Sequence, residues 1–266
     1  MPFRTIDISD PRFEHDGLRQ VTFKSPSLKA RADLTVFIPQ STAKNLPLVL
    51  LLHGVYGSHW AWTQKAGAHH TAARLIAEKI IPPMALAMPS DGLWGDGSAY
   101  LRHRGGDFER YIVDEIPALV RQIEPRIGNT LFITGLSMGG FGALRLGAKH
   151  ANIFSGISAH SAITHFSQML RLVEEPPEAF GSIDEDEASA LHWLDKNRSV
   201  LPPIRFDCGT SDNLLPENRK LHTDLQARKI EHIYQEFPGG HEWSYWETHL
   251  ADSLRFFGGC LNRSNP

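Results

Sequence analysis

The stretch Gly135-Leu136-Ser137-Met138-Gly139-Gly140 follows the apolar residues 130–134 and precedes a segment rich in alanine and leucine. A G-x-S-x-G pattern between a strand and a helix predicts a nucleophile elbow, a sharp turn that raises the serine hydroxyl above the carboxyl edge of a sheet. The glycines suit such a turn because they let neighbouring chain pass close by. Ser137 is therefore the candidate nucleophile. The alternative is a glycine-rich turn with a purely structural role.

The rest of the chain repeats the pattern of a short apolar run followed by a helical segment. Residues 48–52 form an unbroken apolar run, which is typical of a strand buried on both faces. The other predicted core strands are residues 84–88, 131–134, 156–158, 204–208 and 233–237. The predicted helices between them are residues 69–79, 108–123, 140–149 and 217–228. This alternation predicts an α/β fold with a mostly parallel central sheet and helices on both faces.

The organisation predicted from this pattern is a single domain over residues 1–266 with one insertion. Residues 18–23 and 32–38 are expected to add an antiparallel edge to the sheet. Residues 162–203 lie between two predicted core strands and are interpreted as a small helical cap over the strand ends. The alternative is a surface excursion that never touches substrate. Within this segment, the acidic run of residues 184–187 is interpreted as a solvated helix start.

Size and composition exclude several classes of protein. The chain has 266 residues, 41% hydrophobic and 21% charged, and a formal net charge of −3, so it lacks the basic balance of a nucleic-acid-binding protein. No segment has the ~20 apolar residues of a membrane span, and residues 1–10 lack the apolar core of a secretory signal. Two cysteines, Cys208 and Cys260, are too few for a disulfide framework. We therefore expect a cytoplasmic protein, and the sequence leaves open whether it forms a homo-oligomer.

A serine nucleophile needs a histidine base and a carboxylate that orients the base, and on this fold they follow in the order serine, acid, histidine. Residues 204–208 lead into Gly209-Thr210-Ser211-Asp212, and residues 233–237 lead into Pro238-Gly239-Gly240-His241. Asp212 and His241 are therefore the candidate acid and base. Asp207, within a predicted strand, is the rival acid. Asp224 and the other histidines are less well placed.

An oxyanion site needs two backbone N–H groups, one after the nucleophile and one from the loop after an earlier strand. The loop His53-Gly54-Val55-Tyr56-Gly57 follows residues 48–52, so the predicted donors are the N–H groups of Met138 and Val55. His53 is expected to brace this loop by hydrogen bonding.

These motifs together resemble a known family, the esterase D-like esterases, over most of the chain. The stretches that carry the resemblance are LLHGVYG at 51–57 with Trp62, GLSMGGFGA at 135–143, CGTSD at 208–212, and GHEW at 240–243 with Trp246. The resemblance implies an α/β-hydrolase fold, a Ser/Asp/His triad, the oxyanion donors named above and no cofactor. Within the family, the chain looks most like the tributyrin and acetyl esterases. S-formylglutathione hydrolases usually carry other residues at 53–57 and after His241.

The function expected from this reading is hydrolysis of a short-chain, small-molecule ester through a covalent acyl-enzyme. The alternatives are a thioesterase of the S-formylglutathione hydrolase type, a carbohydrate esterase that removes acetyl or feruloyl groups, and a non-catalytic binding protein. The residues expected to line the pocket are Trp60, Trp62, Trp94 and Trp243, with Met169 and Trp193 from the cap. We expect no metal, because His69 and His70 are adjacent and adjacent residues on a helix point in different directions.

Overall fold

The computed structural model describes residues 3 and 5–263, and the described part is built on a nine-stranded sheet. The strand order is β1-β2-β3-β5-β4-β8-β9-β10-β11. The strands in chain order are β1 (Ile6–Ile8), β2 (Leu18–Ser25), β3 (Ala30–Phe37), β4 (Leu46–Leu52), β5 (Ala85–Pro89), β8 (Ile127–Gly135), β9 (Gly156–His160), β10 (Ile204–Gly209) and β11 (Ile233–Phe237). A separate short hairpin pairs β6 (Arg102–His103) with β7 (Gly106–Asp107). Residues 1–2, 4 and 264–266, which fall within the predicted domain, lie outside the described residues.

The pairing directions confirm the predicted α/β sheet. The strands from β5 through β4, β8, β9 and β10 to β11 are all paired in parallel. β1, β2 and β3 form the expected antiparallel edge, and β3 joins the rest through β5. Because β4, β8, β10 and β11 run the same way, their carboxyl ends lie at one edge of the sheet. The loops that carry the predicted site residues therefore start from that edge.

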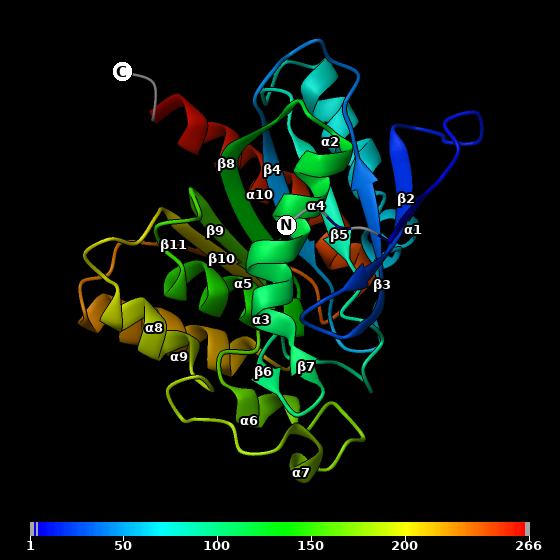
Figure 1. Cartoon of the computed structure of the whole chain (residues 1–266). Coiled ribbons are helices and arrows are strands. Elements are labelled where there is room, and N and C mark those ends of the chain that lie inside the picture. Colours follow the sequence, from blue (N-terminus) through cyan, green and yellow to red (C-terminus); the bar gives the residue numbers. More distant parts are fainter. Residues whose placement is uncertain (1–2, 4, 264–266) are drawn as a thin grey trace.

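Helices cover both faces of the sheet (Figure 1). They are α1 (Ala61–Gln64), α2 (Ala68–Ala77), α3 (Phe108–Arg110), α4 (Ile116–Ile123), α5 (Met138–Lys149), α6 (Phe166–Met169), α7 (Pro177–Phe180), α8 (Ala190–Lys196), α9 (Leu215–Ala227) and α10 (Trp243–Arg263). A π-helical turn, η1 (Tyr111–Glu115), joins α3 to α4. The predicted helix over residues 108–123 is thus interrupted. Pro117 at the start of α4 removes one backbone N–H, which accounts for irregular helical bonding just before it.

The strand side chains alternate between two hydrophobic cores. Leu48, Leu50 and Leu52 of β4 point into the core beneath α3, α4, α5, α8 and α9. Val49 and Leu51 point into the opposite core, with α2 and α10. A strand buried on both faces must be apolar at every position, which is why residues 48–52 read as an unbroken apolar run.

The segment 162–203 contains α6, α7 and α8 and is fastened to α5 by a cluster of ionic groups. Arg145 of α5, 1% exposed at its side chain, pairs with Glu109 and with Glu187. Lys149 Nζ lies 2.7 Å from Glu187 Oε1, and His150 Nε2 lies 2.9 Å from Glu109 Oε1. Residues 184–186 are exposed, as expected, but the run leads into a turn and α8 begins only at Ala190. The interpretation of residues 184–187 as a solvated helix start is therefore wrong, and the Glu187 carboxylate pairs with α5. The sequence could not predict this pairing, because the partners of Glu187 lie far from it in the chain.

This ionic cluster predicts a loss of stability in acid that depends on Glu109. Burial raises the pKa of Glu109, but the hydrogen bond to His150 and the charges of Arg145 and Lys149 outweigh it and lower the pKa to about 2. A carboxylate with a depressed pKa in the folded state stabilises the fold above its unfolded pKa, and this contribution is lost as the pH falls towards 2. We expect Glu109→Gln to remove a contribution on the order of 3 kcal/mol at neutral pH and to flatten the loss below pH 5, measured by urea unfolding. Glu247→Gln, at an exposed position on α10, is the control. Equal pH dependence in wild type and Glu109→Gln would contradict the assignment.

Candidate active site

Ser137 lies on a strained turn between β8 and α5. Its backbone has φ 54° and ψ −117°, a conformation that residues other than glycine rarely adopt. Its N–H donates to the carbonyl of His160 at 3.0 Å, and its own carbonyl accepts from the N–H of Phe141 at 3.1 Å. A Cβ atom on Gly139 would overlap the carbonyl oxygen of Leu52, so glycine is required where α5 crosses the end of β4. The elbow that the sequence predicted is present.

His241 lies between Ser137 and Asp212 with its two ring nitrogens facing them. His241 Nε2 is 3.0 Å from Ser137 Oγ, and His241 Nδ1 is 2.9 Å from Asp212 Oδ2. Asp212 Oδ1 also accepts the N–H of Leu214 at 2.8 Å. The structure therefore brings together three residues from the loops after β8, β10 and β11, as the sequence predicted.

Asp212 and His241 differ in their exposure to solvent. The Asp212 side chain is fully buried, whereas the His241 side chain is 29% exposed. Burial raises the pKa of the Asp212 carboxyl, but the hydrogen bonds to His241 and to the N–H of Leu214 outweigh it, so the pKa lies below its ordinary value. The Asp212 carboxyl is therefore ionised at neutral pH.

The two predicted oxyanion donors belong to different parts of the chain, a helix start and a loop. Met138 is the first residue of α5, and Val55 follows β4. Neither N–H donates a hydrogen bond to another residue in the described part of the chain. Free N–H groups at a helix start carry partial positive charge, and they suit an oxyanion.

The loop after β4 is braced from below by His53, as expected. His53 is buried; its Nδ1 lies 2.7 Å from the carbonyl of Gly54, and its Nε2 accepts the N–H of Asp91 at 3.2 Å. The carbonyl of His53 accepts from the Tyr100 hydroxyl at 3.0 Å. Asp91 and Tyr100 had no role predicted from the sequence, because the pattern that predicted the strand at residues 84–88 does not show which distant loop the following residues contact.

A pocket of about 180 Å³ opens beside Ser137 and His241. Its side-chain walls include Val55, Tyr56, Trp60, Lys65, Trp243 and Trp246. Trp60 and Trp243 thus lie where the sequence predicted them. The Trp246 ring contacts the His241 ring edge to face with 4.9 Å between centroids, and it lies three positions after Trp243 on one face of α10. That i, i+3 spacing was the signal that could have added Trp246 to the predicted pocket.

The other residues predicted to line the pocket lie elsewhere. Trp62 is 1% exposed and donates its indole N–H to the carbonyl of Leu52 at 3.1 Å, so it packs beneath the pocket. Trp94 packs against His103 and Phe180. Met169 is buried in the core, and Trp193 packs against the ammonium groups of Lys149 and Lys196. None of the described residues in 162–203 lines this pocket.

Asp207, the rival acid, belongs to a second hydrogen-bonded cluster beneath the site. Its carboxylate contacts His160 Nδ1 at 2.9 Å, accepts from the Tyr245 hydroxyl at 2.8 Å and pairs with Arg205. His160 Nε2 lies 2.8 Å from the Ser253 hydroxyl. Because the carbonyl of His160 also accepts from Ser137, this cluster supports the elbow from below.

The family described as "Putative esterase" matches residues 25–257. An acetyl esterase from Caldicellulosiruptor saccharolyticus is 27% identical over 270 residues, covering 90% of this chain and 97% of the relative. A ferulic acid esterase structure is 23% identical with a TM-score of 0.79, covering 97% of this chain and 100% of that chain. An S-formylglutathione hydrolase structure from Staphylococcus aureus is 19% identical with a TM-score of 0.76, covering 95% of this chain and 99% of that chain.

The fold is that of the α/β-hydrolases, and the site has a serine at its nucleophile elbow. The chain belongs to the esterase family whose match covers residues 25–257, and it is a serine hydrolase that acts on carboxylic esters. The resemblance to the esterase D-like esterases is confirmed. Among the described residues, no helix is both long enough and apolar enough to cross a bilayer.

The cluster around Asp207 predicts a large structural effect for Asp207→Asn. Removing this carboxylate leaves Arg205 and His160 without their buried anion, and breaking such a buried pair costs about 3–5 kcal/mol. We expect Asp207→Asn to lower the free energy of unfolding by that amount, measured by urea denaturation followed by circular dichroism. The control is Asp186→Asn. Asp186 forms a more exposed pair with His192, so this substitution should change the free energy of unfolding by less than about 1 kcal/mol. Similar losses in the two variants would argue against a supporting role for the buried cluster.

Proposed function

We propose that this esterase hydrolyses short-chain acyl esters, with Ser137 as nucleophile, His241 as general base and acid, and Asp212 as the residue that orients His241. The observation that carries the proposal is the pair of contacts made by His241, 3.0 Å to Ser137 Oγ and 2.9 Å to Asp212 Oδ2. A serine hydroxyl attacks a carbonyl efficiently only when a neighbouring base takes its proton.

The proposed reaction proceeds in two acyl-transfer steps. His241 Nε2 takes the proton of Ser137 as Oγ attacks the ester carbonyl carbon, and the oxyanion is bound by the N–H groups of Val55 and Met138. The protonated His241 then gives its proton to the leaving alcohol, and the acyl group stays on Ser137. Water that loses a proton to His241 attacks the acyl-enzyme; the proton then returns to Ser137 Oγ as the acid leaves. Each oxyanion donor of this kind typically contributes about 2.7–4 kcal/mol to transition-state stabilisation.

The size of the pocket supports a short acyl group. Its volume of about 180 Å³ is below the roughly 300–1,000 Å³ of pockets that enclose drug-sized ligands. Its indole walls, Trp60, Trp243 and Trp246, exclude water from a small apolar group. A long acyl chain would extend past them into solvent.

A second candidate function is favoured by the mouth of the pocket. Tyr56 is 64% exposed and Trp60 is 43% exposed, and both line the pocket. Such exposed rings offer a flat surface to a bulky leaving group, including a sugar, so an acetylated carbohydrate is an alternative substrate. The similarity to an acetyl esterase and a ferulic acid esterase supports testing acetyl and feruloyl sugars.

The compartment is a further part of the proposal. Cys208 is buried and has no disulfide partner among the described residues. Proteins of reducing compartments keep their thiols reduced, which supports a cytoplasmic location.

Ser137→Ala should abolish hydrolysis of p-nitrophenyl acetate. Without the nucleophile, kcat is expected to fall by about 10⁶-fold, and Asp212→Asn should lower it by about 10⁴-fold because His241 loses the group that fixes its tautomer. A fluorophosphonate probe should label the wild type at Ser137 and leave Ser137→Ala unlabelled. The matched control is Ser211→Ala, which changes an exposed serine next to Asp212. Retained activity in Ser137→Ala, with an unchanged circular dichroism spectrum, would refute the assignment.

A substrate panel should show the highest kcat/KM for acetyl and other short acyl esters. The indole walls of a small pocket limit the acyl group, so kcat/KM should fall steeply between butyrate and octanoate p-nitrophenyl esters. S-formylglutathione and acetylated or feruloylated sugars complete the panel. Highest kcat/KM for S-formylglutathione would replace the carboxylesterase proposal with the thioesterase, and highest kcat/KM for the sugars would favour the carbohydrate esterase.

A further inference from the structure

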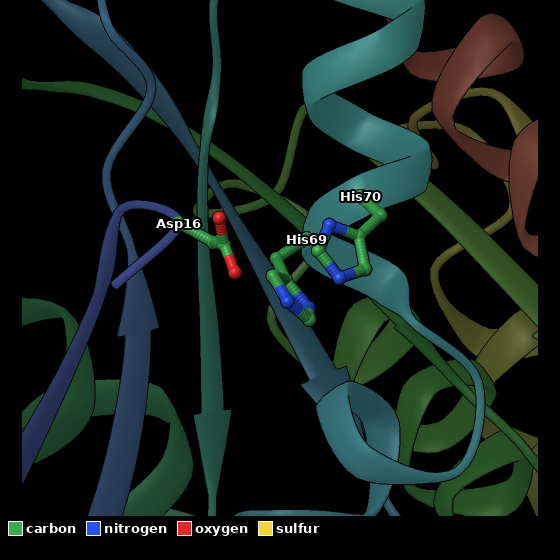
Figure 2. Close-up of side chains that lie close together, drawn as sticks. All are labelled: Asp16, His69 and His70. Carbon is green, nitrogen blue, oxygen red and sulfur yellow. The ribbon is translucent and has the colours of Figure 1, made fainter. Parts of the chain in front are cut away.

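Asp16, His69 and His70 come together at the surface near the start of α2. Asp16 lies in the loop between β1 and β2, and the two histidines lie in the first turn of α2. One nitrogen of each ring and one Asp16 oxygen all lie within 4.8 Å of one another. Figure 2 shows the two rings beside each other on α2 with the Asp16 carboxylate next to them.

The expectation that His69 and His70 point in different directions is wrong. Their ring centroids are 3.8 Å apart, and the planes are tilted by 36°. Adjacent Cβ atoms on a helix do diverge, but a histidine has two further torsions that can turn neighbouring rings towards each other. Sequence spacing alone therefore could not exclude joint action of this pair.

His69 has an unsatisfied nitrogen. The residue is 4% exposed, and its Nδ1 has no hydrogen-bond partner among the described residues. A buried polar atom without a partner costs about 1–3 kcal/mol, so such an atom in a folded protein calls for an explanation. The lone pair of such an imidazole nitrogen is available to a metal ion.

We propose that Asp16, His69 and His70 bind a divalent transition-metal ion of the zinc type. Two imidazoles and a carboxylate are ligands that Zn²⁺ accepts, and they leave a fourth position for water. At the usual zinc–ligand distances of about 2.0–2.2 Å, tetrahedral ligand atoms lie roughly 3.4 Å apart. The present ligand atoms lie within 4.8 Å of one another, so the exposed Asp16 and His70 side chains would rotate to reach these distances. Mg²⁺ and Ca²⁺ prefer oxygen ligands and do not suit this set.

The site acts on the fold and not on the ester. None of the three residues lines the pocket at Ser137. The ion joins the β1–β2 loop to α2, and α2 packs against α10, the helix that carries Trp243 and Trp246. An ion that binds the folded chain and not the unfolded chain stabilises the fold by an amount that grows with the logarithm of its concentration over Kd.

The test is titration of metal-free protein with Zn²⁺ by isothermal titration calorimetry, together with thermal unfolding with and without Zn²⁺. The wild type should bind one ion at this site and unfold at a higher temperature when it is bound, whereas Mg²⁺ should have no effect. His70→Ala and Asp16→Asn should each weaken zinc binding at least tenfold. Both residues are exposed, and asparagine tolerates the positive φ of 55° at residue 16, so both variants should fold.

The matched control is His222→Ala, which breaks another pair of histidines. His222 Nδ1 lies 2.8 Å from His232 Nε2. This variant should keep the zinc affinity and the thermal shift of the wild type. Zinc binding that is absent in the wild type, or that is unchanged in His70→Ala and Asp16→Asn, would overturn the proposal; in the second case the ion binds adventitiously to other histidines.

Discussion

The strained backbone of Ser137 is the constraint on which the rest of the site depends. A residue in this conformation costs on the order of 1–3 kcal/mol, so its surroundings must hold it there. Three backbone hydrogen bonds do so: the Ser137 N–H donates to His160, and the Ser137 carbonyl accepts from Phe141 and Ile163. The strain directs the hydroxyl out of the sheet edge and starts α5 immediately afterwards.

The parallel sheet places the other two residues of the site beside this turn. β8, β10 and β11 end at the same edge, and their loops supply Ser137, Asp212 and His241. The loop after β10 is held against the loop after β11, because the N–H of Ser211 donates to the carbonyl of Gly239 at 2.9 Å. Asp212 and His241 therefore reach Ser137 from rigid supports.

The sequence predicted the parts of the structure that depend on the order of motifs along the chain and on local backbone geometry. The glycine pattern at 135–140 and the chain order of serine, acid and histidine placed all three residues. Tryptophan positions were predicted less well, because an aromatic residue near a motif can face the pocket, as Trp243 does, or the core beneath it, as Trp62 does. The direction in which a tryptophan side chain points depends on packing between elements distant in sequence. The pattern of a single sequence does not show this packing.

Two groups of serine, histidine and aspartate lie close to one another in this fold, and only one can meet a substrate. In the group of Ser253, His160 and Asp207, both His160 and Asp207 have fully buried side chains. The Ser253 hydroxyl is also 2.7 Å from the Ser158 hydroxyl. The Asp207 carboxylate pairs with Arg205 and accepts a hydrogen bond from Tyr245. In the other group, His241 remains 29% exposed at its side chain, and Ser137 lines a pocket. The residue types are the same, so solvent access and free hydrogen-bonding capacity, and not composition, distinguish the group proposed to react from the buried structural one.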